Sequence, residues 1–410
     1  MLTSITRFKH LPIWMKLGLI ALLILLPLGG LLYGFLAAKQ ADIAFAEKEL
    51  RGVEYLAPLK SLLENLQQHR DFVAAILGGN PDQKDRLLST QAAIDTHVRT
   101  IEAIDQRLGK TLDTSTRLRA LVQRWRDVQL KSLDLRFAES FEQHGQMIAD
   151  VIALMQHIGD RSNLILDPYL DSYYLMDTVV NKLPTTIEYL GRLRGLGSNI
   201  VARRTRTLEE RVQLRLFSAQ VKSSLEAVQR GFQVLYKEHP AMERKLTTAF
   251  SRALEGNDTF LTLIDERVAQ AETITLTLPE YFVAGTETVG RFLSLHDEAL
   301  AGLRGLLETR VSGLVASRNT QLIVALLLAL LAISAALGTY RLLTRQIHAI
   351  VALFGPIREG RYEVRTEVFS EDELGTMAAS LNTMLDVMQD QRLSLLRSKE
   401  EHDAMQVAIT

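Results

Sequence analysis

The sequence has 410 residues, long enough for two or three ordinary domains, so a single compact core is not expected. Its 47 basic and 48 acidic side chains almost balance, which removes the electrostatic case for nucleic acid as a partner. Because cysteine is absent, disulfides, thiolate metal sites and cysteine nucleophiles are excluded. Aromatic residues make up only 6% and prolines number 9, a composition that favours long helices over sheets.

Two uncharged, apolar segments are long enough to cross a bilayer, at residues 17–38 and 322–340. A hydrocarbon core of roughly 30 Å needs about 20 helical residues. A cleaved signal peptide is the alternative for the first segment, but its apolar core would be only about 7–15 residues long and would end at a small-residue cleavage site. We therefore expect two transmembrane helices, at 17–38 and 321–340.

Basic residues flank both segments on the same predicted side of the membrane. Cytoplasmic flanks of membrane spans carry an excess of Lys and Arg, so this distribution predicts that both termini are cytoplasmic. Residues 1–16 then form a cytoplasmic N-terminus, and residues 39–320 form an extracytoplasmic domain. The flanking residues are Arg7, Lys9 and Lys16 before the first segment, and Arg341 and Arg345 after the second.

The extracytoplasmic region reads as helix nearly throughout, with breaks at glycine, proline and capping residues. The expected helices are 41–77 (ending at Gly78-Gly79-Asn80-Pro81), one ending at 108, 117–164 with an interruption near Ala138, one opening at Asp167-Pro168 and running to 204, one from the Thr207–Glu210 capping box to about 239, 241–273, and one from Thr277 through 320 into the second span.

An internal repeat adds to this helical pattern. Residues 63–70 (LENLQQHR) align without gaps on residues 187–194 (IEYLGRLR), an offset of 124 positions. A duplication predicts two similar helical hairpins that pack as one elongated bundle or as two stacked modules. A chance match is the alternative. In either case the fold class is all-α.

Two heptad-like seams follow the second span, joined by a non-helical connector at 360–370. Helices this short cannot bury their seams alone, so two chains would combine them into a parallel four-helix coiled coil in a homodimer. The seam positions are Leu343, Ile347, Ile350, Phe354 and Ile357 in the first helix, and Leu374, Met377, Leu381, Met384 and Met388 in the second.

Residues 341–390 resemble a HAMP domain, the signal-converting module of bacterial sensor kinases, chemoreceptors and cyclases. The residues that carry the resemblance are Gly360, the Asp372-Glu373-Leu374-Gly375 box and Asn382-x-Met384. The resemblance implies a bacterial inner-membrane receptor, with signal transmission through Gly360, Glu373, Leu374 and Asn382. The sequence departs from the family in lacking an early proline in the first helix, where Gln346-Ile347 stands, and in having Pro356 near that helix's end.

The extracytoplasmic region resembles helical sensor domains of chemoreceptors and sensor kinases over about a third of its length. The similar segments are residues 67–71 with 78–80, 166–177 and 191–197. Some of these domains, including the nitrate- and nitrite-sensing type, hold a small anion between arginines on facing helices. The resemblance therefore implies that this protein senses a small extracytoplasmic solute, either directly or through a periplasmic binding protein.

Arg70 and Arg194 are the strongest candidates for ligand contact, because the repeat puts them at equivalent positions. Two guanidinium forks suit nitrate or a carboxylate, whereas buried arginines without an anion would each need a carboxylate partner. Glu64 and Glu188 lie close enough in sequence to be those partners. A structural ion pair, or a solvated helix face, is the alternative.

Three further residues are candidates for the binding site. His69 precedes Arg70 in the motif, and Tyr173 and Asp177 lie one turn apart on the helix that leads to Arg194. For the tyrosine, a hydroxyl bonded within the bundle core is the alternative.

The sequence offers no catalytic residues, metal site or cofactor. The nine histidines form no one-turn pair or zinc signature, and no phosphate-binding glycine loop occurs. Residues 391–410 continue as a signalling helix, so we expect a missing downstream module or a separate partner to supply the output. A chemoreceptor-type transducer is the first interpretation. The front end of a sensor histidine kinase or diguanylate cyclase is the second, and a ligand-free structural coiled-coil protein is the third.

Overall fold

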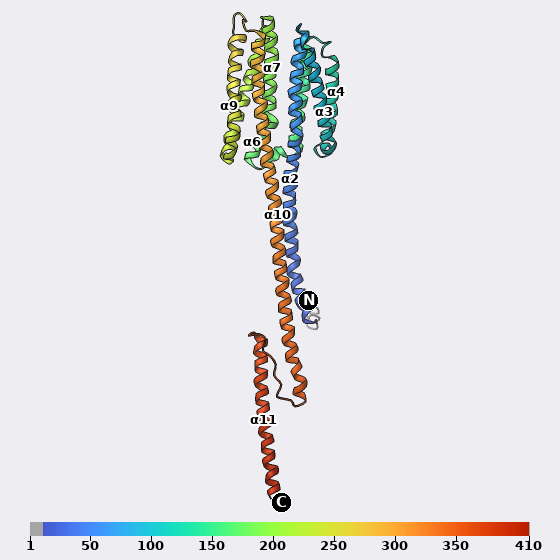
Figure 1. The fold of residues 1–410 in the computed structure, drawn as a ribbon, viewed down its shortest axis with the longest axis vertical. Helices are drawn as coiled ribbons and strands as arrows, with labels where there is room; N and C mark the ends of the chain where they lie inside the picture. Colours follow the sequence, from blue (N-terminus) through green and yellow to red (C-terminus); the bar gives the residue numbers. More distant parts are fainter. Residues whose placement is uncertain (1–10, 410) are drawn as a thin grey trace, which may run out of the picture. The chain divides into compact units, whose positions relative to one another are not determined.

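The computed structural model describes residues 11–409, and in this range the chain is helical without a strand. It divides into two compact units, residues 37–316 and a unit made of residues up to 36 with those from 317 onward (Figure 1). The all-α prediction is therefore confirmed. Arg7 and Lys9, on which the predicted orientation partly depends, lie outside the described residues.

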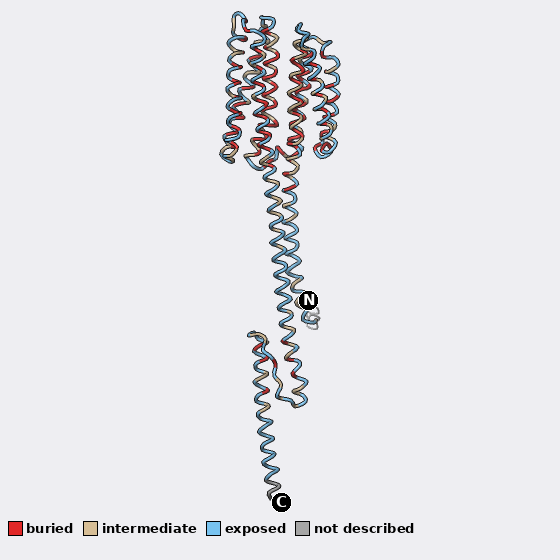
Figure 2. The backbone as a smooth tube through the Cα atoms, in the orientation of Figure 1, coloured by how far each residue is buried: buried red, intermediate tan, exposed pale blue. Residues whose placement is uncertain are grey.

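Residues 37–316 form a helical bundle with two halves. The first half contains α2 (Ile13–Leu77), α3 (Lys84–Leu112), α4 (Ser115–Lys131) and α5 (Phe137–Arg161). The second contains α6 (Leu170–Met176), a π-helical segment (Asp177–Lys182), α7 (Leu183–Arg203), α8 (Leu208–Glu238), α9 (Pro240–Ile264), a second π-helical segment (Asp265–Ala269) and the start of α10 (Leu278–Arg358). Buried apolar residues of these helices form one continuous core, and Figure 2 shows the buried positions recurring along the helices of this unit.

Several predicted helix ends are confirmed by their capping chemistry. α2 ends at Leu77, and Gly79 follows with a φ of 94°, a conformation that glycine adopts without strain. At the start of α8, Glu210 N donates to Thr207 Oγ1 at 3.1 Å while Thr207 N donates to Glu210 Oε2 at 2.8 Å. This reciprocal pair is the predicted capping box.

Two of the predicted boundaries are wrong. Gly109 does not end its helix, since α3 continues to Leu112 and the turn comes at Asp113, with a φ of 53°. Asp167-Pro168 does not cap a helix, since α6 begins only at Leu170. The Asp167 carboxylate accepts from Tyr169 N at 3.0 Å and pairs with a distant arginine, so a tertiary contact takes the place of the cap.

The two repeated segments lie on neighbouring helices that run in the same direction. Gln67 on α2 donates to the Ile187 carbonyl oxygen of α7 at 3.1 Å. Four residues further along α2, Asp71 lies beside Arg194, seven residues further along α7. Because both numbers increase together, α2 and α7 are parallel, and the repeat positions face one another at nearly the same level.

The second unit contains the end of α10, a connector and α11 (Glu373–Ile409). Pro356 lies in the last turn of α10, and Gly360 follows with a φ of 75°. Asn382 binds the connector, donating to the Thr366 carbonyl oxygen and accepting from Thr366 N, both at 2.9 Å. Asp372 Oδ1 caps α11 by accepting from the Leu374 and Gly375 amides at 3.0 Å.

The side chains buried within this unit differ in part from the predicted seams. Ile350 is buried as expected, but Phe354, Met377 and Met384 are exposed in the single chain. The other buried positions are Gln346 and Leu353 in α10, Thr366 in the connector, and Gly375, Ala378 and Leu385 in α11. In one chain the two helices therefore contact each other through only part of their apolar surface.

The apolar segments expected to cross the membrane lie in α2 and α10. Both helices are long and apolar enough to span a bilayer, and their most apolar windows are unburied within the protein. Exposed leucines and isoleucines at these positions would be costly in water and are typical of lipid contact.

Candidate functional site

Arg70 and Arg194 both lie in the interior of the bundle, on adjacent faces of α2 and α7. Their side chains are 0% and 4% exposed. Arg70 Nη1 donates to Glu188 Oε1 at 2.7 Å. Arg194 Nη2 lies 2.6 Å from Asp71 Oδ2, a short ion-pair contact without the alignment of a hydrogen bond. Each helix thus contributes one arginine and one carboxylate to a crossed pair of salt bridges.

Glu188 and Asp71 differ in the number of hydrogen bonds that they accept. Besides Arg70, Glu188 accepts from Arg192 Nε at 2.8 Å and from Gln67 Nε2 at 2.9 Å. Neither oxygen of Asp71 has an aligned hydrogen bond. Burial raises the pKa of Asp71, and the Arg194 and Arg70 guanidiniums only partly oppose this effect.

Three guanidinium nitrogens at the site are buried without an acceptor. Arg70 Nε and Nη2 and Arg194 Nε have no hydrogen-bond partner. A buried donor without an acceptor costs about 1–3 kcal/mol. Both oxygens of Asp71 and Gln67 Oε1 are also buried without a hydrogen-bond partner, so the acceptor atoms present are not aligned with these donors. A small oxyanion offers several such atoms in the planar geometry that guanidinium groups favour.

Aromatic rings close the site from two other helices. Phe141 on α5 lies over Arg70, with the guanidinium carbon 4.9 Å from the ring centroid, and Phe282 on α10 lies 5.7 Å from Arg194. Tyr281 on α10 donates its hydroxyl to the Leu193 carbonyl oxygen at 2.7 Å. The first turn of α10, the helix that contains the second apolar segment, therefore contacts the arginine site directly.

Glycine on α7 allows this close packing. A Cβ atom at Gly197 would lie 1.9 Å from Tyr281 Oη, and one at Gly191 would lie 2.8 Å from both Arg70 Nη2 and Gln67 Nε2. Any larger residue would push α10 or α2 away from α7.

His69 lies beside the arginines in a buried chain of hydrogen bonds. His144 Nδ1 is 2.7 Å from the Ser140 carbonyl oxygen, so it carries the proton, and its Nε2 accepts from His69 Nδ1 at 2.8 Å. Gln91 Nε2 then donates to His69 Nε2 at 3.1 Å. Burial lowers the pKa of His69 to about 3 and that of His144 to about 4, so both rings are neutral at physiological pH.

The structure does not bring Tyr173 and Asp177 to the arginines. Asp177 accepts from Asn181 Nδ2 at 3.0 Å and pairs with Lys182 in the π-helical segment. Arg194 follows Asp177 by 17 residues along helical chain, about 25 Å at 1.5 Å per residue. Tyr173 packs edge-on against Tyr174, with the ring centroids 5.4 Å apart.

Glu64 is not a partner of either arginine, because it faces Lys60, 3.9 Å away on its own helix. Asp71 was missed as the partner of Arg194. It directly follows Arg70 in the chain, which was the only signal available, since pairing with Arg194 depends on how α2 and α7 pack.

A second buried charged cluster lies far along α2 and α10 from the arginine site. Arg310 on α10 approaches Glu49 on α2 at 3.3 Å and Asp167 in the crossover between the halves at 3.1 Å, and both carboxylates are fully buried. The Arg310 guanidinium also lies over the Tyr169 ring at 4.1 Å. Burial, with Asp167 nearby, raises the pKa of Glu49 to about 8.

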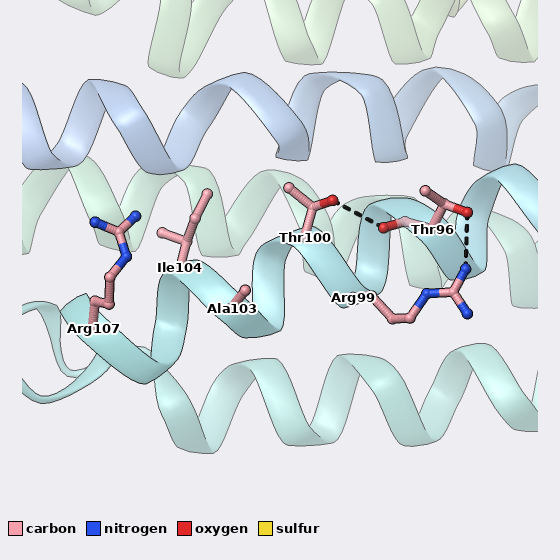
Figure 3. A pocket seen from close by; sticks show the side chains of 6 residues that line it. All are labelled: Thr96, Arg99, Thr100, Ala103, Ile104 and Arg107. Atoms are coloured by element: carbon pink, nitrogen blue, oxygen red, sulfur yellow. Dashed lines mark hydrogen bonds between the residues drawn. The ribbon is translucent and has the colours of Figure 1, made fainter.

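Two surface hollows of about 450 Å³ lie away from the arginines. One is a shallow strip on α3, where Arg99 Nη2 donates to Thr96 Oγ1 at 3.1 Å and Arg107 lies at the far end (Figure 3). The other lies between α8 and the end of α9, with Arg215 and Lys222 lining it from α8. Within residues 11–409, no group of three or more histidine or acidic side chains could hold a metal ion.

Comparison with known proteins identifies both parts of the chain. Residues 61–323 match the family described as nitrate and nitrite sensing, and residues 338–390 match the HAMP domain. No curated protein matches the sequence. A solved structure described as that of the NasR transcription antiterminator aligns with a TM-score of 0.54 over 90% of this chain and 99% of that chain, at 14% identity, and so supports the fold alone. The chain belongs to the nitrate and nitrite sensing family, and it is a transmembrane sensor whose sensing domain is followed by a HAMP signalling domain.

Proposed function

We propose that the protein is an inner-membrane receptor that binds a small oxyanion, nitrate or nitrite first, between Arg70 and Arg194. The observation that carries the proposal is the pair of buried arginines, in which three guanidinium nitrogens have no hydrogen-bond partner. The family match favours nitrate and nitrite over the other candidate, a small carboxylate. A periplasmic binding protein that docks on the bundle remains the alternative route for the signal.

Anion binding requires the site to rearrange. The rings of Phe141 and Phe282 cover the arginines, and both guanidiniums are already paired with carboxylates. An anion shifts the equilibrium from the closed to the opened packing of the helices only to the extent that it binds the opened packing more tightly. Charge-assisted hydrogen bonds contribute about 1.5–3 kcal/mol each, so two or three of them are enough to invert a two-state population.

Thermal unfolding of the full chain in lipid nanodiscs tests the binding proposal. Nitrate, nitrite and acetate are added separately, and a ligand at about 100 times its Kd stabilises the folded state by about 2.7 kcal/mol. The test variant combines Arg194→Gln with Asp71→Asn. It removes both charges of one buried pair, so no uncompensated charge is left in the core.

The matched control combines Arg124→Gln with Asp150→Asn, an exposed pair 2.7 Å apart on α4 and α5. We expect nitrate or nitrite to raise the Tm of the wild type and of the control, and to leave the Tm of the R194Q/D71N variant unchanged. A nitrate-dependent rise that persists in R194Q/D71N would contradict the assignment of the site.

The proposed relay passes through α10 to the HAMP domain. α10 is one helix from Leu278 to Arg358, so a displacement of its first turn can travel along it into the second apolar segment. We propose that the chain acts as a homodimer in which Phe354, Met377 and Met384, exposed in the single chain, meet their counterparts. Both termini are proposed to be cytoplasmic.

The proposed output is of the chemoreceptor type, and the alternative is a histidine kinase or diguanylate cyclase. The long helix α11, which follows the connector, would carry the signal in either case. Co-purification of the membrane-embedded protein with a chemotaxis kinase and its coupling protein supports the first. Autophosphorylation or cyclic-dinucleotide synthesis by the natural gene product supports the second.

A further inference from the structure

Asp71 occupies the position on Arg194 that an incoming anion needs. Its Oδ2 atom is 2.6 Å from Arg194 Nη2, and its side chain is 4% exposed. An oxyanion that uses the free Nε group of Arg194 would lie against this carboxylate. Two negative groups in contact repel each other strongly where water is scarce.

The charges of the four buried side chains at the site cancel before any anion binds. Arg70 and Arg194 carry two positive charges and Glu188 and Asp71 two negative ones, and all four side chains are no more than 8% exposed. The group is neutral when empty, so a monovalent anion leaves one negative charge uncompensated. Arg192 is 24% exposed and is already bonded to Glu188, so it contributes much less to this balance.

The elements packed around Asp71 contribute both neutral and charged groups. α5 contributes the neutral His144, and α10 contributes Phe282 and Tyr281, whose hydroxyl is bonded to a carbonyl oxygen. The charged and titratable groups facing the site are His69 and Arg70 on α2, Glu188, Arg192 and Arg194 on α7, His144 on α5, and Tyr281 on α10.

A proton on Asp71 is the simplest compensation. Glu188 accepts three hydrogen bonds, whereas Asp71 makes only the ion-pair contact with Arg194. Burial already raises the pKa of Asp71 in the empty protein, and a bound anion would raise it further. Protonation would also release Arg194 from its ion pair and make its donors available.

We propose that the sensor takes up its anion together with one proton, and that Asp71 is the group that accepts the proton. This inference depends on the proposed anion site, and it adds a proton to that site as a second ligand. Because the complex binds one proton more than the empty protein, anion affinity falls as the pH rises. The limiting slope is about tenfold in Kd per pH unit above the pKa of Asp71 in the empty protein. The receptor would then report nitrate most sensitively in acidic surroundings.

Isothermal titration of the full chain in nanodiscs with sodium nitrate tests the proposal. Nitrate does not itself titrate between about pH 5.5 and about pH 8.5, so a pH effect on affinity belongs to the protein. Titrations in two buffers of different ionisation enthalpy give the number of protons taken up per nitrate. We expect that number to approach one for the wild type over part of this range, with the Kd weakening as the pH rises.

Asp71→Asn keeps the shape of the side chain and removes both the charge and the titration. We expect it to bind nitrate at least as tightly as the wild type, with no proton uptake and no dependence of the Kd on pH. Asp150→Asn is the matched control, an exposed aspartate in an ion pair with Arg124, and it should behave as the wild type does.

The outcomes separate this inference from the proposed function. If wild-type protein gives no heat with nitrate and no nitrate-dependent Tm shift, the anion site itself is refuted. If nitrate binds without proton uptake, or if folded D71N still takes up a proton or loses nitrate binding, the inference is overturned and the anion site stands. Should D71N fail to fold, the proton count of the wild type alone decides.

Discussion

Replacing Glu49 by Gln should stabilise the protein at alkaline pH. In the folded state the pKa of Glu49 is about 8, against 4.5 for an ordinary glutamate, because burial and the neighbouring Asp167 outweigh Arg310. Below about pH 4.5 both the folded and the unfolded state hold the proton. Between about pH 4.5 and about pH 8 the unfolded state releases it, so Glu49 lowers the free energy of unfolding as the pH rises.

The size of this effect follows from the shift. About 3.5 pH units at 1.36 kcal/mol each give an upper limit of about 5 kcal/mol above pH 8, and relaxation around Arg310 reduces this to about 2–5 kcal/mol. For a domain of this size that is a Tm difference of about 5–15 °C. Gln keeps the shape of the side chain, and Arg310 retains Asp167 at 3.1 Å.

Circular-dichroism melts of wild type and E49Q from about pH 5.5 to about pH 8.5 provide the assay. The control is Glu54→Gln, which removes an exposed carboxylate of α2 paired with Arg107. We expect the Tm of E49Q to exceed that of E54Q by an amount that grows as the pH rises. Effects of pH on Tm that are common to both variants cancel in this difference. If E49Q is instead less stable than E54Q, and increasingly so at high pH, Glu49 is ionised in the fold and the argument from burial is refuted.

Two further predictions concern packing and assembly. Gly197→Ala places a methyl group against Tyr281, so we expect the free energy of unfolding to fall by about 1–3 kcal/mol or more. Gly290→Ala is the control, because no atom lies within 4 Å of the added Cβ, and it should be neutral or slightly stabilising. Chemical denaturation measures both. The chain has no cysteine of its own, so an introduced cysteine can pair only with its counterpart in a second chain. Phe354→Cys should form disulfide-linked dimers in oxidised membranes, and His348→Cys on the same helix should form fewer. Equal yields would count against the homodimer.

The sequence predicted most of the helix boundaries, because local chemistry determines them. Gly79 needs a positive φ, and Thr207 and Glu210 satisfy each other's backbone amides without help from elsewhere in the chain. Asp167 shows the limit of this reasoning. Its neighbour Pro168 suggested a helix start, but the carboxylate is held by Arg310, which lies 143 positions away.

The sequence predicted both arginines of the candidate site, but it did not predict which carboxylate pairs with which arginine. Arg70 and Arg194 stand at matching positions of the repeat, and the structure places the two helices side by side. Which acid meets which arginine depends on the rotation of α2 against α7, and no periodicity in the sequence encodes that angle. Glu188 was among the candidates by proximity in sequence, and Asp71 was not.

Tyr281 offers a way to separate anion binding from its transmission. Its hydroxyl bonds to the Leu193 carbonyl oxygen, one residue before Arg194, at the first turn of the helix that carries the second apolar segment. Tyr281→Phe removes this hydrogen bond and keeps the ring packed against Phe260. We expect Y281F to bind nitrate with nearly unchanged Kd.

We also expect Y281F to lose the nitrate-dependent change in amide hydrogen exchange over the first turns of α10. The reason is that movement of Arg194 reaches α10 through the hydrogen bond, whereas affinity depends on the guanidinium groups. Tyr236→Phe on α8, which removes a hydroxyl that lies beside Thr247 and Glu243 of α9, is the matched control and should keep the exchange response. A full response in Y281F would mean that packing of the rings alone couples the arginine site to α10.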